Sequence, residues 1–400
     1  MAYVAVPSAS KLFFNNANTF YVALTGSDSG NDGSVDRPLR TIQAAVTAAA
    51  SGDCILVGPG NFAETVAINK NLSISALVPG ATSVNCATAA VTTLTVTGAV
   101  ANQTLSWEGI HIVNSDNSGI TSLALAVIGG GVAGTYVFRN CNIIGGAETA
   151  NAGAAVSFTG NAGNGAIVDI QSPKIVGAHY INILHAADEV IYRECTFDRG
   201  PALWMRVIGN AAGNVKIIAS THRGLTTTEY IEYGNAAATT ALLSLISSKM
   251  NCYLRLNTTA AGYVTIEDSS VTYTTSNQVN QVIRYVNGDY IRFNMQNIDL
   301  NSAAIRTMYT VPGAGRYFCP ERVQTANRGA VTGGGPLQYR YGGTGAATVV
   351  AMVVGNLAQG TTVNTVVQDA IVSGGTLKFE VAVAANAGSV GEATVWGRLV

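Results

Sequence analysis

Polar side chains able to transfer protons gather in one stretch of this sequence and recur about one repeat later. Carboxylate and imidazole groups act as general acids and bases when they are held beside a reacting group. The polar cluster comprises His185, Asp188, Glu189, Arg193, Glu194, Asp198 and Arg199, followed by His222 and Arg223. If the chain is an enzyme, its catalytic residues are expected to be Asp188, Arg193, Glu194, Asp198 and His222. Asp198 and His222 both fall late in their repeats, so we expect them to lie near each other.

The same cluster has a simpler interpretation, as charges on a solvated face and at the corners of a structural protein, and we favour it. No Asp–Asp pair, no grouped carboxylates of the kind that bind calcium and no Asp repeated on successive strands stand out. Second candidates are Glu229 and Glu232, and the adjacent Glu267 and Asp268. Successive strand residues point to opposite faces, which separates Glu267 from Asp268.

Cysteines, histidines and aromatic residues point to no metal and no cofactor. The six cysteines are widely spaced, without a CxxC pair or a Cys/His cluster, and are expected to be small buried apolar residues. The four histidines are isolated in the sequence. Aromatic residues are scattered, so Trp204, Tyr230 and Tyr233 are expected in the core or at an interface rather than in a sugar-stacking platform.

The elements that must position these side chains form a repeat. From about residue 53 to residue 301, a short alternating strand, a Gly/Asn/Ala turn and a second alternating strand recur with starts roughly 20–35 residues apart, the period of a stacked solenoid. Asn140–Cys141 and Glu194–Cys195 fall at equivalent places, where each cysteine would stack in the interior. A β-sandwich is the alternative, but its turns recur about every 8–12 residues. We therefore predict an all-β solenoid.

Both ends of the solenoid have predicted covers. Ile42, Ala45, Val46 and Ala49 form an apolar stripe near residues 40–50, which predicts a capping helix over an otherwise open β edge. The remaining organisation is expected as follows: an N-terminal attachment segment at 1–20, the solenoid at 21–312, a Gly-rich connector at 313–345 and a small antiparallel, β-sandwich-like oligomerisation domain at 346–400.

Composition excludes several classes of protein. Charged residues are 11% and hydrophobic residues 48% of the 400 residues, which excludes a disordered chain. The net charge of −1 offers no basic surface, so no nucleic-acid partner is expected. The sequence has no run of about 18 apolar residues, so no membrane insertion is expected. The first residues lack the basic and apolar regions of a secretory signal, so we expect a chain made and folded in a cytoplasm.

One segment near the N-terminus carries a family resemblance. Its matching residues are Tyr21, Gly26, Asp28, Asp32, Gly33, Pro38, Thr41, Ile42, Gln43, Gly52, Asp53, Pro59, Gly60 and Glu64. This segment resembles the opening of the pectate-lyase-like right-handed parallel β-helix superfamily, including the bacteriophage tail-spike type. The resemblance is strong over about 50 residues and weak to about residue 300. It implies an all-β, right-handed single-stranded parallel β-helix with an N-terminal capping helix and a small C-terminal antiparallel β-domain.

The resemblance implies three classes of function, because enzymes, adhesins and virion spikes share this fold. We expect a bacteriophage virion structural protein, a homotrimeric spike or fibre on the tail or the capsid. It would contact other virion proteins through the N-terminal segment, and a host cell-surface polysaccharide is a further expected contact. One alternative is a polysaccharide lyase or glycoside hydrolase, acting through paired Asp/Glu or through an Arg or Lys base with Ca²⁺. A bacterial surface adhesin is the second alternative. The missing leader counts against both.

Overall fold

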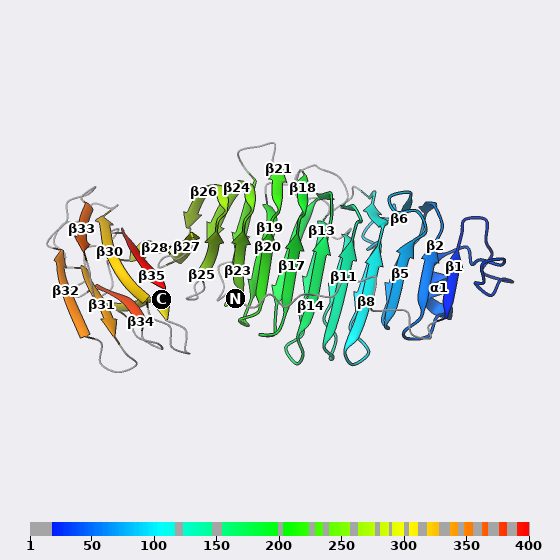
Figure 1. The fold of residues 1–400 in the computed structure, drawn as a ribbon, viewed down its shortest axis with the longest axis horizontal. Helices are drawn as coiled ribbons and strands as arrows, with labels where there is room; N and C mark the ends of the chain where they lie inside the picture. The colour runs from blue at the N-terminus through cyan, green and yellow to red at the C-terminus, as the bar shows by residue number, and fades with distance from the viewer. Residues whose placement is uncertain are drawn as a thin grey trace. The chain divides into compact units, whose positions relative to one another are not determined.

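The chain divides into two compact units, which are described separately (Figure 1). The computed structural model describes residues 18–116, 123–145, 154–198, 203–223, 229–234, 240–256, 263–276, 281–287, 290–299, 304–310, 318–327, 337–342, 348–354, 362–366, 376–381 and 390–399. The first unit comprises Met1–Glu232, Ser247–Leu254 and Ser270–Tyr273, and the second comprises Tyr233–Ile246, Arg255–Ser269 and Thr274–Val400. The expected attachment segment lies outside the described residues up to residue 17.

The first unit is a right-handed parallel β-helix, in which each coil gives one strand to each of three parallel stacks. The first stack contains β2 (Cys54–Val57), β5 (Leu72–Ala76), β8 (Gln103–Glu108), β11 (Gly134–Arg139), β14 (Ala166–Gln171), β17 (Glu189–Arg193) and β20 (Asn214–Ile218). The second contains β3 (Gly60–Phe62), β6 (Thr82–Cys86), β9 (Ile110–Asn114), β12 (Ile143–Ile144), β15 (Ile175–Val176), β18 (Thr196–Asp198), β21 (Thr221–Arg223) and β24 (Lys249–Leu256). The third contains β4 (Val66–Ile68), β7 (Leu94–Thr97), β10 (Leu123–Ile128), β13 (Ala154–Thr159), β16 (Ala178–Ile183), β19 (Leu203–Gly209) and β22 (Tyr230–Tyr233). The second and third stacks join where β24 pairs with β22, and β26 (Ser270–Ser276) also pairs with β24.

Strand register places like side chains above one another in the interior. In the first stack, Trp107 lies beside Phe138, and Phe138 beside Ile170. Ile170 in turn lies beside Tyr192, and all four side chains are buried. One coil alone leaves such an apolar face in water, whereas stacking buries it and pairs the backbone with the coils on either side. The alternation seen in the sequence is therefore the inside–outside alternation of each coil.

The corner between the first and second stacks repeats one backbone conformation. Asn140, Glu194 and Ala219 all have positive φ angles, of 53°, 51° and 49°. The residue after the first two is a buried cysteine, Cys141 or Cys195. The expected equivalence of these two corners, with cysteines stacked inside, is confirmed.

The start of the β-helix is covered as predicted. Helix α1 (Ile42–Ala48) buries Ile42, Ala45 and Val46, and the Thr41 hydroxyl accepts a hydrogen bond from the Ala44 N–H at its N-terminus. Strand β1 (Thr19–Val22) pairs with β2. In the described stretches, α1 is the one helix and is far too short to cross a bilayer.

The second unit begins with parallel strands and continues with antiparallel ones. Parallel pairing joins β23 (Leu242–Ile246), β25 (Tyr263–Glu267) and β27 (Gln281–Asn287). An antiparallel sheet then orders β27, β28 (Tyr290–Asp299), β35 (Val390–Leu399), β30 (Phe318–Asn327) and β33 (Thr362–Val366). A four-stranded sheet orders β29 (Ala304–Thr310), β34 (Thr376–Val381), β31 (Leu337–Gly342) and β32 (Thr348–Val354).

These strands correct part of the expected domain boundaries. Antiparallel pairing already begins at β28, well before residue 346. The expected connector at 313–345 contains β30 and β31, which pair with strands of the C-terminal sheets. Because this segment is rich in glycine, the sequence pattern did not show that two of its runs form strands. The antiparallel C-terminal architecture itself is confirmed.

Candidate functional site

Asp188 is turned into the β-helix, where it holds a turn together. It is fully buried at the turn between β16 and β17. One carboxylate oxygen accepts a hydrogen bond from the Ala166 N–H at 2.9 Å, and the other accepts from the Leu184 and His185 N–H groups at 3.0 and 2.9 Å. A carboxylate with three backbone donors closes the turn and ties it to the preceding coil. His185 completes the same turn, where its Nδ1 accepts from the Ala187 N–H at 3.0 Å.

Arg193 lies on the outer face of the first stack, and Glu194 lies at the corner that follows it. Each contacts the preceding coil. The Arg193 Nε lies 3.1 Å from Asp169 Oδ1, and Arg139 approaches the same carboxylate from the other side at 3.9 Å. Glu194 accepts a hydrogen bond of 2.6 Å from the Gln171 amide. The Asp169 carboxylate is thus the centre of a charged row that crosses three coils.

The other cluster members occupy separate places. Asp198 lies 3.5 Å from Lys174 on the outer face of the second stack, and both side chains are partly exposed. Glu189 pairs with Lys216 on the first stack. Arg223 is exposed, and Arg199 lies outside the described residues.

His222 points into the β-helix, away from the outer charges. Its neighbour in the preceding coil is the buried Phe197, whereas Asp198 is paired with Arg223. The expected proximity of Asp198 and His222 therefore holds for their strands, but the two side chains lie on opposite sides of the stack. The His222 Nε2 is 3.1 Å from a carboxylate oxygen of the buried Glu229. Burial lowers the pKa of His222 to about 4, although the Asn251 backbone and the Asp198 charge oppose this shift.

A second buried histidine lies in the same part of the interior. The Nδ1 of His179 is 2.9 Å from the Tyr192 hydroxyl, and its ring meets Tyr192 and Phe197 edge-on. Burial, followed by the neighbouring His222, lowers the pKa of His179 to about 3. His179 is therefore neutral near pH 7, and this polar group belongs to the core.

The second-choice carboxylates are divided between core and corner. Glu232 is buried and accepts a hydrogen bond of 2.7 Å from the Arg206 Nε, while Glu229 faces His222. Asp268 is exposed at a corner with a positive φ angle of 44°, and Glu267 ends β25. Tyr233 is buried and donates to the Ala241 carbonyl, as expected for a core residue. No group of three or more metal-ligating side chains occurs among the described residues.

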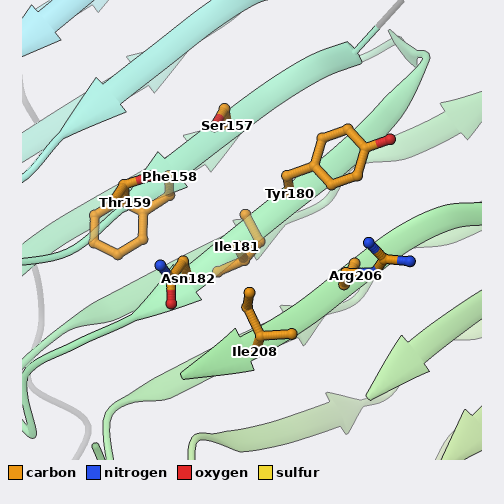
Figure 2. Close-up of a pocket in the computed structure, with 8 residues that line it drawn as sticks. All are labelled: Ser157, Phe158, Thr159, Tyr180, Ile181, Asn182, Arg206 and Ile208. Carbon is orange, nitrogen blue, oxygen red and sulfur yellow. The ribbon is translucent and has the colours of Figure 1, made fainter. Parts of the chain in front are cut away.

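The outer face of the third stack carries a small hollow of about 60 Å³ that the sequence pattern did not reveal (Figure 2). The residues that line it are Ser157, Phe158, Thr159, Tyr180, Ile181, Asn182, Arg206 and Ile208. Strand register arranges the outward residues in two rows across β13, β16 and β19. One row is Ser157, Tyr180 and Arg206, and the other is Thr159, Asn182 and Ile208.

This hollow brings aromatic and polar side chains together on one outer face. It offers an aromatic ring, an amide, two hydroxyls and a guanidinium whose charge is balanced by Glu232. Sequence reasoning missed Tyr180 and Arg206 because no dense charge or motif surrounds them. The available signal was strand alternation, which puts Tyr180 outside wherever His179 is inside.

No protein-family model matches the chain, and no curated protein matches it. Among solved structures, it is similar to the pectin methylesterase PemA from Erwinia chrysanthemi, with 12% identity, 64% of this chain and 89% of that chain covered, and a TM-score of 0.39. It is similar to the pectate lyase Pel9A with 13% identity, 67% of this chain and 80% of that chain covered, and a TM-score of 0.42. It is also similar to the enzymatically active domain of tailspike protein 4 of bacteriophage CBA120, with 11% identity. There, 90% of this chain and 65% of that chain are covered, and the TM-score is 0.37.

Likeness at these identities concerns the fold and transfers no activity. The fold itself follows from the parallel pairing of the three stacks. The prediction of a parallel β-helix is confirmed.

Proposed function

We propose that this chain is a structural protein of a bacteriophage virion, a homotrimeric β-helical spike or fibre. The observation that supports this proposal is the set of contacts that the polar cluster makes. Asp188, Arg193 and Glu194 each bond to the preceding coil, through Ala166, Asp169 and Gln171. Side chains that a catalytic site would turn toward a substrate here join one coil to the next. That use suits a stiff shaft.

The second unit supports the oligomeric part of the proposal. One of its antiparallel sheets ends in β33, and the four-stranded sheet has β29 and β32 at its two edges. Strands at sheet edges carry unpaired backbone groups that a neighbouring chain can cover. We therefore place the contacts of the proposed trimer in this unit. Attachment to the particle through residues 1–20 remains a prediction from the sequence.

Two measurements on the full chain test this proposal. Light scattering at micromolar concentration should give three times the 41.2 kDa of one chain. Antibodies against the chain should label one end of the tail, or the capsid, in electron micrographs of particles from cells that produce it. A monomer, or particles without label, would contradict the proposal. Cleavage of an acidic or neutral polysaccharide that is abolished by Glu194→Ala would show that the polar cluster is catalytic instead.

A further inference from the structure

The turn between β13 and β14 contains Asn164 followed by Gly165. An asparagine becomes aspartate or isoaspartate when the backbone nitrogen of the next residue attacks its side-chain amide carbon. Glycine permits this attack best, because it has no Cβ and leaves the backbone free to turn. The reaction in a folded chain also needs an accessible amide and an attacking nitrogen that is not held elsewhere.

The attacking nitrogen is available in this turn. The Gly165 N–H donates no hydrogen bond within the part of the chain that the structure describes. Asn164 and Gly165 are partly exposed, and Ala162 and Gly163 before them are exposed. The Asn164 Nδ2 donates to the Gly131 carbonyl of the preceding coil at 2.6 Å, in a surface contact. Breaking this one bond frees the amide to meet the nitrogen.

Packing keeps glycine at position 165. A Cβ there would lie 2.5 Å from the Cβ of Ala187 and 2.8 Å from its carbonyl oxygen, in the turn of the following coil. Both distances are well below the roughly 3.5–4.0 Å at which carbon atoms make good contact. The close approach of two coils thus requires, after Asn164, the residue that makes an asparagine most reactive.

Asn114, at the end of β9, shows the opposite arrangement. It is buried, and its Nδ2 donates to two backbone carbonyls at 2.8 and 3.0 Å. The next nitrogen, that of Ser115, donates to the Cys86 carbonyl at 2.9 Å. Reaction at Asn114 therefore needs the coil to open, whereas reaction at Asn164 needs only its turn to move.

We propose that Asn164 of the folded chain deamidates spontaneously through a cyclic imide with Gly165. The Gly165 nitrogen forms a bond to the Asn164 Cγ, and the side-chain nitrogen leaves as ammonia, taking up the proton that Gly165 loses. Water then opens the imide at either carbonyl, which gives aspartate or isoaspartate.

The products weaken one contact between coils. Both replace a neutral amide by a carboxylate and remove the donor to the Gly131 carbonyl. Isoaspartate also adds one methylene to the backbone beside Ala166, whose N–H bonds to Asp188. The site lies within the first unit and does not depend on the proposed virion role.

Peptide mapping by mass spectrometry of the full chain tests the proposal. The folded chain, and the chain unfolded in guanidinium chloride, are incubated at pH 6 and at pH 8 and then digested. The Asn164 peptide should gain one dalton, contain isoaspartate, and react faster at pH 8, because the attacking nitrogen must lose its proton. Folding should slow the reaction at Asn164 by less than about tenfold and at Asn114 by more than that. Comparing each site with its own unfolded rate removes the difference between glycine and serine.

Asn164→Gln is the matched variant. It keeps an amide but would have to form a less favourable six-membered ring, so its peptide should not gain mass. Circular dichroism confirms that it is folded. The peptides are resolved from that of Asn287, which also precedes a glycine, although Gly288 lies outside the described residues. The proposal would be overturned if folding slows both asparagines equally, if aspartate forms without isoaspartate, or if the folded Asn164→Gln variant gains the same mass.

Discussion

The outer faces of the first and third stacks use the same kind of position in opposite ways. On the first stack, the charged row through Arg139, Asp169 and Arg193 spans three coils, and its members contact one another. On the third stack, Arg206 bonds to Glu232 at one end of a row, but Ser157, Tyr180 and Asn182 face a hollow. Both faces belong to one β-helix with a continuous interior.

The two faces differ in how much their polar groups contribute to the stability of the stack. Polar groups that satisfy one another across coils stabilise the stack and leave little for a ligand. Polar groups around a hollow contribute less to the stack and remain available. The comparison therefore predicts that substitutions on the first face lower stability more than substitutions at the hollow.

Acidification should have the largest effect, because it acts on the interior behind both faces. His179 and His222 have pKa values of about 3 and about 4 in the folded chain, against 6.5 as the ordinary value. The unfolded chain thus binds more protons below pH 6.5, and stability falls as the pH drops toward these folded values. From pH 6.5 to pH 4.5 the expected loss is about 4 kcal/mol for both histidines together.

Urea unfolding across this pH range measures the effect. His179→Gln should remove about half of the pH dependence. Burial raises the pKa of Glu64, whose contribution has the opposite sign near pH 4.5. A free energy of unfolding that stays constant from pH 6.5 to pH 4.5 would show that the histidines are not buried in neutral form.

Asp188→Ala should have the next largest effect. It leaves the N–H groups of Ala166, Leu184 and His185 without their acceptor in a buried turn. The expected loss is about 3 kcal/mol in the free energy of unfolding, measured with urea at pH 7. Asp188→Asn keeps one carbonyl oxygen and should lose less. If Asp188→Ala is as stable as the original chain, the carboxylate does not hold this turn.

Asp169→Ala tests the charged row directly and should cost about 2 kcal/mol, because it leaves two arginines beside an empty position. Urea unfolding at pH 7 measures the loss, and an unchanged free energy of unfolding would show that the charged row does not hold the coils together.

Tyr180→Ala should have the smallest effect on stability, within about 0.5 kcal/mol, because its ring lies over the outer surface. Thermal unfolding followed by circular dichroism measures this effect on stability. A marked drop in the unfolding temperature would place Tyr180 among the residues that hold the coils together.

The sequence was informative wherever one residue type recurs with the coil. Alternating apolar residues predicted the stacks, and the equivalent Asn140–Cys141 and Glu194–Cys195 positions predicted a shared corner. The stripe of Ile42, Ala45 and Val46 predicted α1. Each of these patterns reflects a local geometry that repeats, so it is visible without knowledge of neighbouring coils.

The polar cluster was harder to interpret, because its contacts depend on turns. Asp188 follows the end of β16 in a turn that directs it inward, and no alternation rule applies there. His222 sits on a three-residue strand, too short to show which side is buried. The prediction of a connector at 313–345 was wrong for a related reason. Its two strands form by pairing with strands far away in the sequence, and a glycine-rich composition does not reveal such pairing. In each case the deciding partner lies more than twenty residues away or across a turn.

The central claim is that the polar residues of the first stack join coils, and a double-mutant cycle on Asp169 and Arg193 tests it most directly. The free energies of unfolding of Asp169→Ala, Arg193→Ala, the double variant and the original chain give the coupling between the two side chains. We expect a favourable coupling of about 1 kcal/mol, modest because Arg193 is partly exposed. Additive effects, with a coupling of zero, would contradict the claim.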